Sequence, residues 1–235
     1  MSFYSDFAAH YERIFPFREV VLSYLVERLP KSPARVLDAG CGPGHYCGHL
    51  AETGLEAVGL DLDAEMITAA RDRYPDAEFH HLDLVDASIL PGFFDGALCL
   101  GNVAAHLDRD RLEQTLSALQ AKMPAGAPWL VQTVNWDALL DRSLYVFPDR
   151  DLDGVVFQRE YLEISDRSLI FRTRLIENGR EIFAGEETLY PLLAADSQAL
   201  HADLGFDLVS HHADFQGADF DPEQPGGSVM TFRRR

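Results

Sequence analysis

The chain has 235 residues and a mass of 26.3 kDa, a length that predicts one domain able to bury a core without disulfides or metal. Its 20 Lys and Arg side chains stand against 38 Asp and Glu, a formal net charge of −18. Because nucleic acids and anionic membrane surfaces are bound mainly through Lys and Arg, this balance argues against both as partners.

The cysteines and the first residues bear on the compartment. Cys41, Cys47 and Cys99 are too few for a disulfide framework, and their spacing with nearby histidines does not close a zinc site. The first residues lack the basic and apolar stretches of a signal peptide, and no apolar run reaches the ~18 residues that span a bilayer. We expect a cytoplasmic protein without a bound metal.

The predicted elements alternate between strands and helices as far as residue 134. Residues 3–30 are expected to be largely helical, with an interruption near Pro16. Beyond them, alternation of strand and helix indicates a parallel sheet covered on both faces. Strands are expected at 35–39, 57–60, 78–82, 96–100 and 127–134, with a helix through 50–53 and helices at 64–74 and 109–122.

The pattern changes after residue 150. Three strand-like runs follow one another without helices, and Asn178-Gly179 between the last two is a strong hairpin signal. We therefore expect an antiparallel β-meander inserted at 150–190. The expected elements from there to the end are strands at 155–164, 169–176 and 181–189, a helix at 197–204, and strands at 206–211 and 228–233.

A glycine-rich turn follows the first strand. Asp38 ends the strand, and Gly40, Gly42 and Gly44 lead into the helix, where glycines let a ligand approach the backbone. A dinucleotide-binding turn would need its third glycine at position 45, where this chain has His45. The turn therefore indicates a nucleotide-like ligand at the carboxyl end of the sheet and disfavours a nicotinamide dinucleotide.

This stretch resembles motif I of the class I S-adenosylmethionine-dependent methyltransferases. The acids that end the second and third strands, and the Phe94–Leu100 strand, agree with that family in order and spacing. The resemblance implies a Rossmann-like, doubly wound α/β fold with seven strands, mostly parallel, and an antiparallel last strand. It also implies one domain over residues 1–235, with residues 1–30 as a helical lid.

The resemblance implies S-adenosyl-L-methionine as the cofactor. It places Asp61 on the two ribose hydroxyls, which suits a carboxylate at a strand end, and Asp83 on the adenine amino group. The other cofactor contacts that it implies are Tyr11, Asp38, Gly40, Cys41, Gly42, Gly44, Leu62, Met66, Leu84, Leu100 and Asn102.

Several of these residues have a plainer interpretation. Met66 at helical spacing also fits an ordinary core position, and Asp38 could bind the cofactor amino group or only the amides of the turn. Tyr11 belongs to an aromatic stripe with Tyr4 and Phe7 that fits either a lid over the cofactor or a core face.

The segment after the fourth strand concerns the acceptor. Leu100-Gly101-Asn102, followed by His106, resembles a segment of small-molecule N-methyltransferases, including the glycine and sarcosine enzymes. An amine attacks only when unprotonated, so a neutral His106 is the candidate catalytic residue; a structural histidine bonded to a carbonyl is the alternative.

The sequence therefore predicts a methyltransferase that acts on a small-molecule acceptor, with N-methylation favoured over O-methylation. A nicotinamide-dependent oxidoreductase and a non-catalytic binding module on the same fold are the alternatives. Exposed strand edges make a homodimer possible. If the acidic loop at 212–224 borders the cleft, a neutral or cationic acceptor is favoured over an anionic one.

Overall fold

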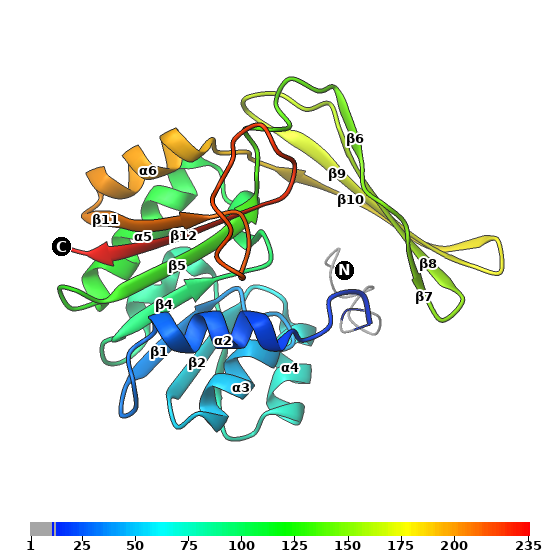
Figure 1. The fold of residues 1–235 in the computed structure, drawn as a ribbon. Coiled ribbons are helices and arrows are strands. Elements are labelled where there is room, and N and C mark those ends of the chain that lie inside the picture. Colours follow the sequence, from blue (N-terminus) through cyan, green and yellow to red (C-terminus); the bar gives the residue numbers. More distant parts are fainter. Residues whose placement is uncertain (1–10, 12) are drawn as a thin grey trace.

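The computed structural model describes Tyr11 and residues 13–235, and its centre is a seven-stranded sheet (Figure 1). The strands lie in the order β11-β12-β5-β4-β1-β2-β3, and β12 runs antiparallel to both of its neighbours. The predicted doubly wound sheet with an antiparallel last strand is confirmed. Its strands are β1 (Arg35–Ala39), β2 (Glu56–Asp61), β3 (Glu78–His81), β4 (Gly96–Cys99), β5 (Pro128–Val134), β11 (Phe206–His212) and β12 (Gly227–Arg234).

Helices cover both faces of this sheet (Figure 1). One face carries α2 (Glu19–Arg28), α3 (His45–Glu52) and α4 (Ala64–Arg73). The other carries α5 (Arg109–Lys122), α6 (Ala194–Asp203) and the 3-10 helix η1 (Leu84–Ile89). A second 3-10 helix, η2 (Val103–His106), follows β4.

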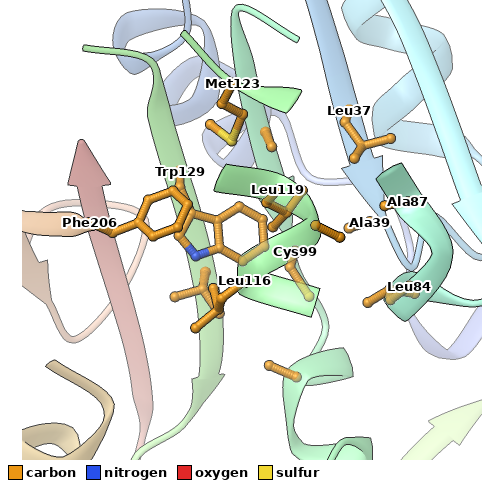
Figure 2. Packing of buried hydrophobic residues seen from close by; sticks show 14 of the residues in the cluster. Leu37, Ala39, Leu84, Ala87, Cys99, Leu116, Leu119, Met123, Trp129 and Phe206 are labelled. Atoms are coloured by element: carbon orange, nitrogen blue, oxygen red, sulfur yellow. The ribbon is translucent and has the colours of Figure 1, made fainter. Parts of the chain in front are cut away.

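Each central strand contributes side chains to the hydrophobic cores on both faces of the sheet, because successive side chains point to opposite faces. On β1, Val36 belongs to the core beneath α2 and α3, whereas Leu37 belongs to the core beneath α5 and η1. In that second core Trp129 of β5 packs with Leu116 and Leu119 of α5 (Figure 2). Both faces of the central strands are therefore apolar. Polar side chains that could bind a ligand lie at the ends of these strands.

The inserted segment forms a separate antiparallel sheet that projects beyond the first one (Figure 1). Asn178 and Gly179 both have positive φ, 50° and 74°, as the predicted hairpin requires. Two short strands precede the three expected ones, so the sheet starts before residue 150. Its strands are β6 (Leu144–Val146), β7 (Arg150–Leu152), β8 (Val155–Leu162), β9 (Leu169–Glu177) and β10 (Arg180–Leu189).

The two ends of the insertion meet. The backbone N–H of Ala194 donates to Asp137 Oδ2 at 2.9 Å, and Tyr190 N–H donates to the Ala105 carbonyl at 2.7 Å. Asp137 thereby caps α6 from 57 residues away, and the helix starts at Ala194 instead of the predicted residue 197.

Two expectations concern the start of the chain and the membrane. The predicted lid at 1–30 is described only in part: α2 is a helix, while Tyr4 and Phe7 lie outside the described residues. In the part of the chain that the structure describes, no helix is long and apolar enough to cross a bilayer.

Candidate cofactor and acceptor site

The glycine turn between β1 and α3 has a fixed shape. Gly40, Gly42 and Gly44 all have positive φ, at 83°, 53° and 81°. The N–H groups of Gly40 and Cys41 both donate to the Leu60 carbonyl on β2, at 2.8 and 3.0 Å. L-residues with a side chain rarely adopt this backbone, so the spacing of the glycines is a requirement of the turn itself.

Two of these glycines are also required by packing. A Cβ at Gly40 would lie 2.5 Å from Val103 Cγ1, and one at Gly44 would lie 2.7 Å from the Phe79 ring. A Cβ at Gly42 would instead lie 3.6 Å from the Tyr11 hydroxyl, an ordinary contact distance. Tyr11 therefore lies over the middle of the turn, on the side that a ligand would approach.

Asp61 is held beside the turn at the end of β2. Its Oδ2 accepts from Gly42 N–H at 2.8 Å and its Oδ1 accepts from Asp63 N–H at 2.9 Å. Each carboxylate oxygen can accept a further hydrogen bond, so the group remains able to bind a vicinal diol. Asp63 itself caps α4 by accepting from Glu65 and Met66 N–H, as Asp at such positions often does.

Asp38 and Asp61 form an acidic pair in which Asp38 is buried and Asp61 is partly buried. Burial and the nearby charge of Asp61 raise the pKa of Asp38 to about 7, against a hydrogen bond from the Cys47 backbone that lowers it. Burial likewise raises the pKa of Asp61, against bonds from backbone N–H groups. Two neighbouring acids that are costly to ionise together favour a ligand that brings positive charge.

The other predicted contacts differ in how they are placed. Leu62 is exposed at 62%, whereas Met66 is buried at 2%, as the core interpretation of that residue requires. Leu84 and Leu100 are buried too. These four stay predictions as cofactor contacts, because backbone groups at strand ends can bind a ligand whether or not the side chain is exposed.

The carboxylate of Asp83 has a partner that the sequence did not indicate. Arg111 of α5 donates to both of its oxygens, at 2.8 and 2.6 Å, and Val85 N–H donates to Oδ1 at 3.2 Å. A carboxylate that accepts three hydrogen bonds from two donor groups is firmly positioned but has less capacity left for an adenine amino group. Its assignment to adenine stays a prediction.

The turn after β4 is tied to the end of β5. Asn102 has φ 67°, and its Oδ1 accepts from Val134 N–H at 3.0 Å, while Gly101 N–H donates to Gln132 Oε1 at 2.8 Å. These bonds fix where η2 begins, and Val103 at its start packs on Gly40. The glycine turn and the predicted acceptor segment are therefore in direct contact.

His106 ends η2 and is half-buried. Burial lowers the pKa of its imidazole to about 4, so the ring is neutral at pH 7. A neutral ring has a nitrogen lone pair, which is what the predicted proton acceptor needs. The same low pKa makes it a weak base, so its protonated form is short-lived.

No cluster of three or more potential metal ligands occurs among the residues that the structure describes. The three cysteines are free and buried, and burial raises the pKa of each thiol. Cys41 stays a prediction as a cofactor contact through its place in the turn.

The acidic loop between β11 and β12 is attached to the end of β5. Asn135 Nδ2 donates to the carbonyls of Asp221 and Gln224, both at 2.8 Å, and Asn135 N–H donates to the Gly226 carbonyl. The acidic loop is thus attached just beyond the carboxyl end of β5, and its proximity to an acceptor stays a prediction.

Residues 36–126 match the family described as "Methyltransferase domain". A dTDP-3-amino-3,6-dideoxy-alpha-D-glucopyranose N,N-dimethyltransferase of Streptomyces fradiae is 40% identical over 57% of this chain and 49% of its own length. A glycine/sarcosine N-methyltransferase of Halorhodospira halochloris is 27% identical over 85% of this chain and 76% of its own length. The chain thus spans about half the length of the first of these relatives.

Among solved structures, an S-adenosylmethionine-dependent methyltransferase from Clostridium acetobutylicum superposes with a TM-score of 0.78. The superposition covers 98% of both chains at 15% identity, which establishes a common fold. The fold is that of the class I S-adenosylmethionine-dependent methyltransferases. The match of residues 36–126 to a methyltransferase domain confirms the resemblance seen in the glycine turn.

Proposed function

We propose that the protein is an S-adenosylmethionine-dependent methyltransferase that methylates an amine of a small molecule. The observation that carries the proposal is the glycine turn with Asp61 bonded to Gly42, set beside Asp38 at the carboxyl ends of β1 and β2. A buried and a partly buried acid beside a glycine turn suit a ligand with ribose hydroxyls and positive charge.

The bound cofactor would supply a methyl group on a sulfonium, which the lone pair of an acceptor displaces in line. Asp61 would hold the ribose, and Asp38 would hold the amino group of the methionine part. Tyr11, over Gly42, would exclude water from the reacting atoms. Positioning of this kind provides most of the acceleration in a displacement that needs no covalent intermediate on the protein.

His106 would orient the lone pair of an unprotonated acceptor amine. Its neutral ring would accept a hydrogen bond from the amine nitrogen, and η2 places it one short turn from Val103, which touches the glycine turn. N-methylation is favoured over O-methylation because the two relatives described above are named as N-methyltransferases. An alcohol acceptor would need a stronger base than a histidine with a lowered pKa.

The experiment has two arms. Calorimetry compares S-adenosylmethionine with NAD, and tight binding of the first alone is expected. A metabolite pool is then incubated with methyl-labelled cofactor, and the labelled product is identified by mass spectrometry. Binding of NAD without S-adenosylmethionine would favour the oxidoreductase, and cofactor binding without any labelled product would favour the non-catalytic module.

A cytoplasmic location and a homodimer complete the proposal. The edge strands β10 and β11 carry exposed apolar side chains, among them Ile182, Leu208 and Val209. Exposed edges of this kind favour pairing with a second copy. Sedimentation of the purified protein over a range of concentrations distinguishes the dimer from the monomer.

A further inference from the structure

The inserted sheet has an inner face directed toward the site. On β8, Phe157, Arg159 and Tyr161 share this face because side chains alternate along a strand. Phe157 packs with Ile14 and Phe15 of the N-terminal segment, and Tyr161 packs with Trp136, which follows β5. Arg159 is the one basic residue on this face of β8, between two buried aromatic residues.

Arg159 has no acidic partner among the described residues. Its Nε is buried without a hydrogen bond, and no carboxylate of the described chain lies within 4.0 Å of its guanidinium. The guanidinium carbon lies 4.4 Å from the Phe147 ring centroid and 5.4 Å from that of Phe157. Burial and nearby Arg150 lower the pKa of Arg159 to about 10, so it stays charged at pH 7.

Thr173 stands directly opposite Arg159 in the β8–β9 ladder. Its side chain is 1% exposed, and its hydroxyl has no hydrogen-bond partner. Side chains opposite each other on one face have Cβ atoms roughly 4.5–5.5 Å apart. A half-buried guanidinium with a buried, unbonded Nε and a fully buried hydroxyl are therefore neighbours, both with unused hydrogen-bonding capacity.

The outer face of the same sheet shows the usual arrangement. Arg172 pairs with Glu160 and Glu186, and Arg174 pairs with Glu160 and Glu181. These arginines are partly exposed, so water already stabilises them. Arg159 is also half-buried, but its buried Nε has no hydrogen bond and its guanidinium has no carboxylate partner in the described part of the chain, and a desolvated polar group without a partner is costly.

Contacts place Arg159 between the glycine turn and η2. On one side, Tyr11 over Gly42 contacts Phe15, with ring centroids 5.2 Å apart, and Phe15 contacts Phe157 at 5.9 Å. On the other side, Ala105 of η2 and Trp136 belong to one apolar cluster with Tyr161, two residues beyond Arg159. Both lines of contact end on the residues that flank Arg159.

We infer that Arg159 and Thr173 form a subsite for an anionic group, a carboxylate or a phosphate, carried by the methyl acceptor. The inference rests on the proposed function for its account of what the anion belongs to. It makes the acceptor a molecule with an amine at the η2 end and an anion at the inserted sheet. The guanidinium binds the anion through charge-assisted hydrogen bonds, and the Thr173 hydroxyl adds one more.

The test follows the Arg159 Nε–Hε signal by nuclear magnetic resonance in the full chain with S-adenosylhomocysteine bound. Sodium acetate, inorganic phosphate and neutral acetamide are titrated at constant ionic strength. We expect a saturable shift with acetate, phosphate or both, and none with acetamide. A response to acetate alone points to carboxylate acceptors, and a response to phosphate alone points to phosphate acceptors.

Variants provide the controls. The affinities of the variants are measured by calorimetric titration with the same anions, because Arg159→Gln lacks the Nε–Hε signal. Arg159→Gln is expected to weaken anion affinity roughly tenfold, and Thr173→Val by a few fold, since each removes hydrogen bonds to an anion. Arg172→Gln makes the same change on the outer face and is expected to leave the affinity unchanged. Arg159→Lys keeps the positive charge but lacks the Nε–Hε group. Loss of the signal in this variant therefore assigns the signal to Arg159, even if Arg159→Gln does not fold.

Two results would overturn the subsite: no saturable shift with either anion, or an equal loss of affinity in Arg172→Gln. Calorimetry with S-adenosylhomocysteine separates this failure from failure of the proposed function. If the cofactor product binds and the anions do not, only the subsite falls. If S-adenosylhomocysteine does not bind, the anions are titrated into the protein without it. That titration still shows whether Arg159 and Thr173 bind an anion.

Discussion

The two sheets of the molecule treat their polar groups differently. In the seven-stranded sheet, the polar side chains at the strand ends are held by backbone groups: Asp61 by two N–H donors, Asn102 by the end of β5. In the inserted sheet, the Arg159 Nε and the Thr173 hydroxyl are buried atoms with unused hydrogen-bonding capacity. The polar groups of the first sheet are already oriented, as a ligand of fixed shape requires. Those of the inserted sheet would complete their hydrogen bonds only when a ligand binds.

The largest expected effect is on the first sheet. Asp61→Ala should weaken S-adenosylmethionine binding by about a hundredfold or more, because it removes charge-assisted hydrogen bonds to the ribose. Asp61→Asn keeps the shape and loses the charge, so its affinity should lie between those of Asp61→Ala and the wild type. Calorimetry measures both, with Asp72→Ala on the exposed side of α4 as the control. An unchanged affinity in Asp61→Ala would remove Asp61 from the site.

The next largest effect is on stability and tests the contact between the glycine turn and η2. Gly40→Ala should lower the free energy of unfolding by about 2–4 kcal/mol, from backbone strain at φ 83° together with the clash against Val103. Val103→Ala in the same chain should restore part of this loss. Urea denaturation of the two single variants and the double variant measures the coupling, and strictly additive losses would contradict direct contact as the cause.

His106→Ala should reduce kcat by roughly tenfold to a hundredfold and leave the affinity for S-adenosylmethionine unchanged. Because the pKa of His106 is lowered to about 4, the wild-type rate should show no ionisation of this ring between pH 5 and 8. Steady-state kinetics with the identified acceptor measure both, with His80→Ala on β3 as the control. An unaltered kcat would leave His106 with a structural role.

The smallest effect is a pH dependence of cofactor binding. Asp38 has its pKa raised to about 7, so it is mostly protonated below that pH, and a positively charged ligand favours its ionised form. Affinity for S-adenosylmethionine should therefore rise with pH up to about 7 and then level off, by at most about tenfold per pH unit. Calorimetry at several pH values measures the slope, and Asp38→Asn should abolish it. A slope that persists in Asp38→Asn would belong to another group.

The cofactor end of the fold could be predicted because its signals are local. The glycines at 40, 42 and 44 define a turn by their own backbone needs, and apolar runs alternating with helices define a parallel sheet. Asp61 and Asp38 follow from their places at strand ends. The contact between Val103 and Gly40 was missed, since the two residues are distant in the sequence.

The remainder depends on tertiary contacts that leave no local signal. The pairing of Asp83 with Arg111 and the capping of α6 by Asp137 join residues 28 and 57 positions apart. Arg159 has a faint signal: it follows Val155 and Phe157 and precedes Tyr161 at alternate positions, so a basic residue occurs on an apolar face. Arg172 and Arg174 lie on the opposite face.

The hydrogen bond between Asp137 and Ala194 bears on whether the inserted segment could be exchanged between related chains. The insertion leaves and re-enters the α/β frame at one place, because the Asp137 carboxylate joins its start to the first residue of α6. A segment of different length can replace it with little change in the entropy of joining its ends, which grows only slowly with loop length. If the inserted sheet binds the acceptor as proposed, exchanging it for that of a related chain should alter substrate choice and leave cofactor binding unchanged.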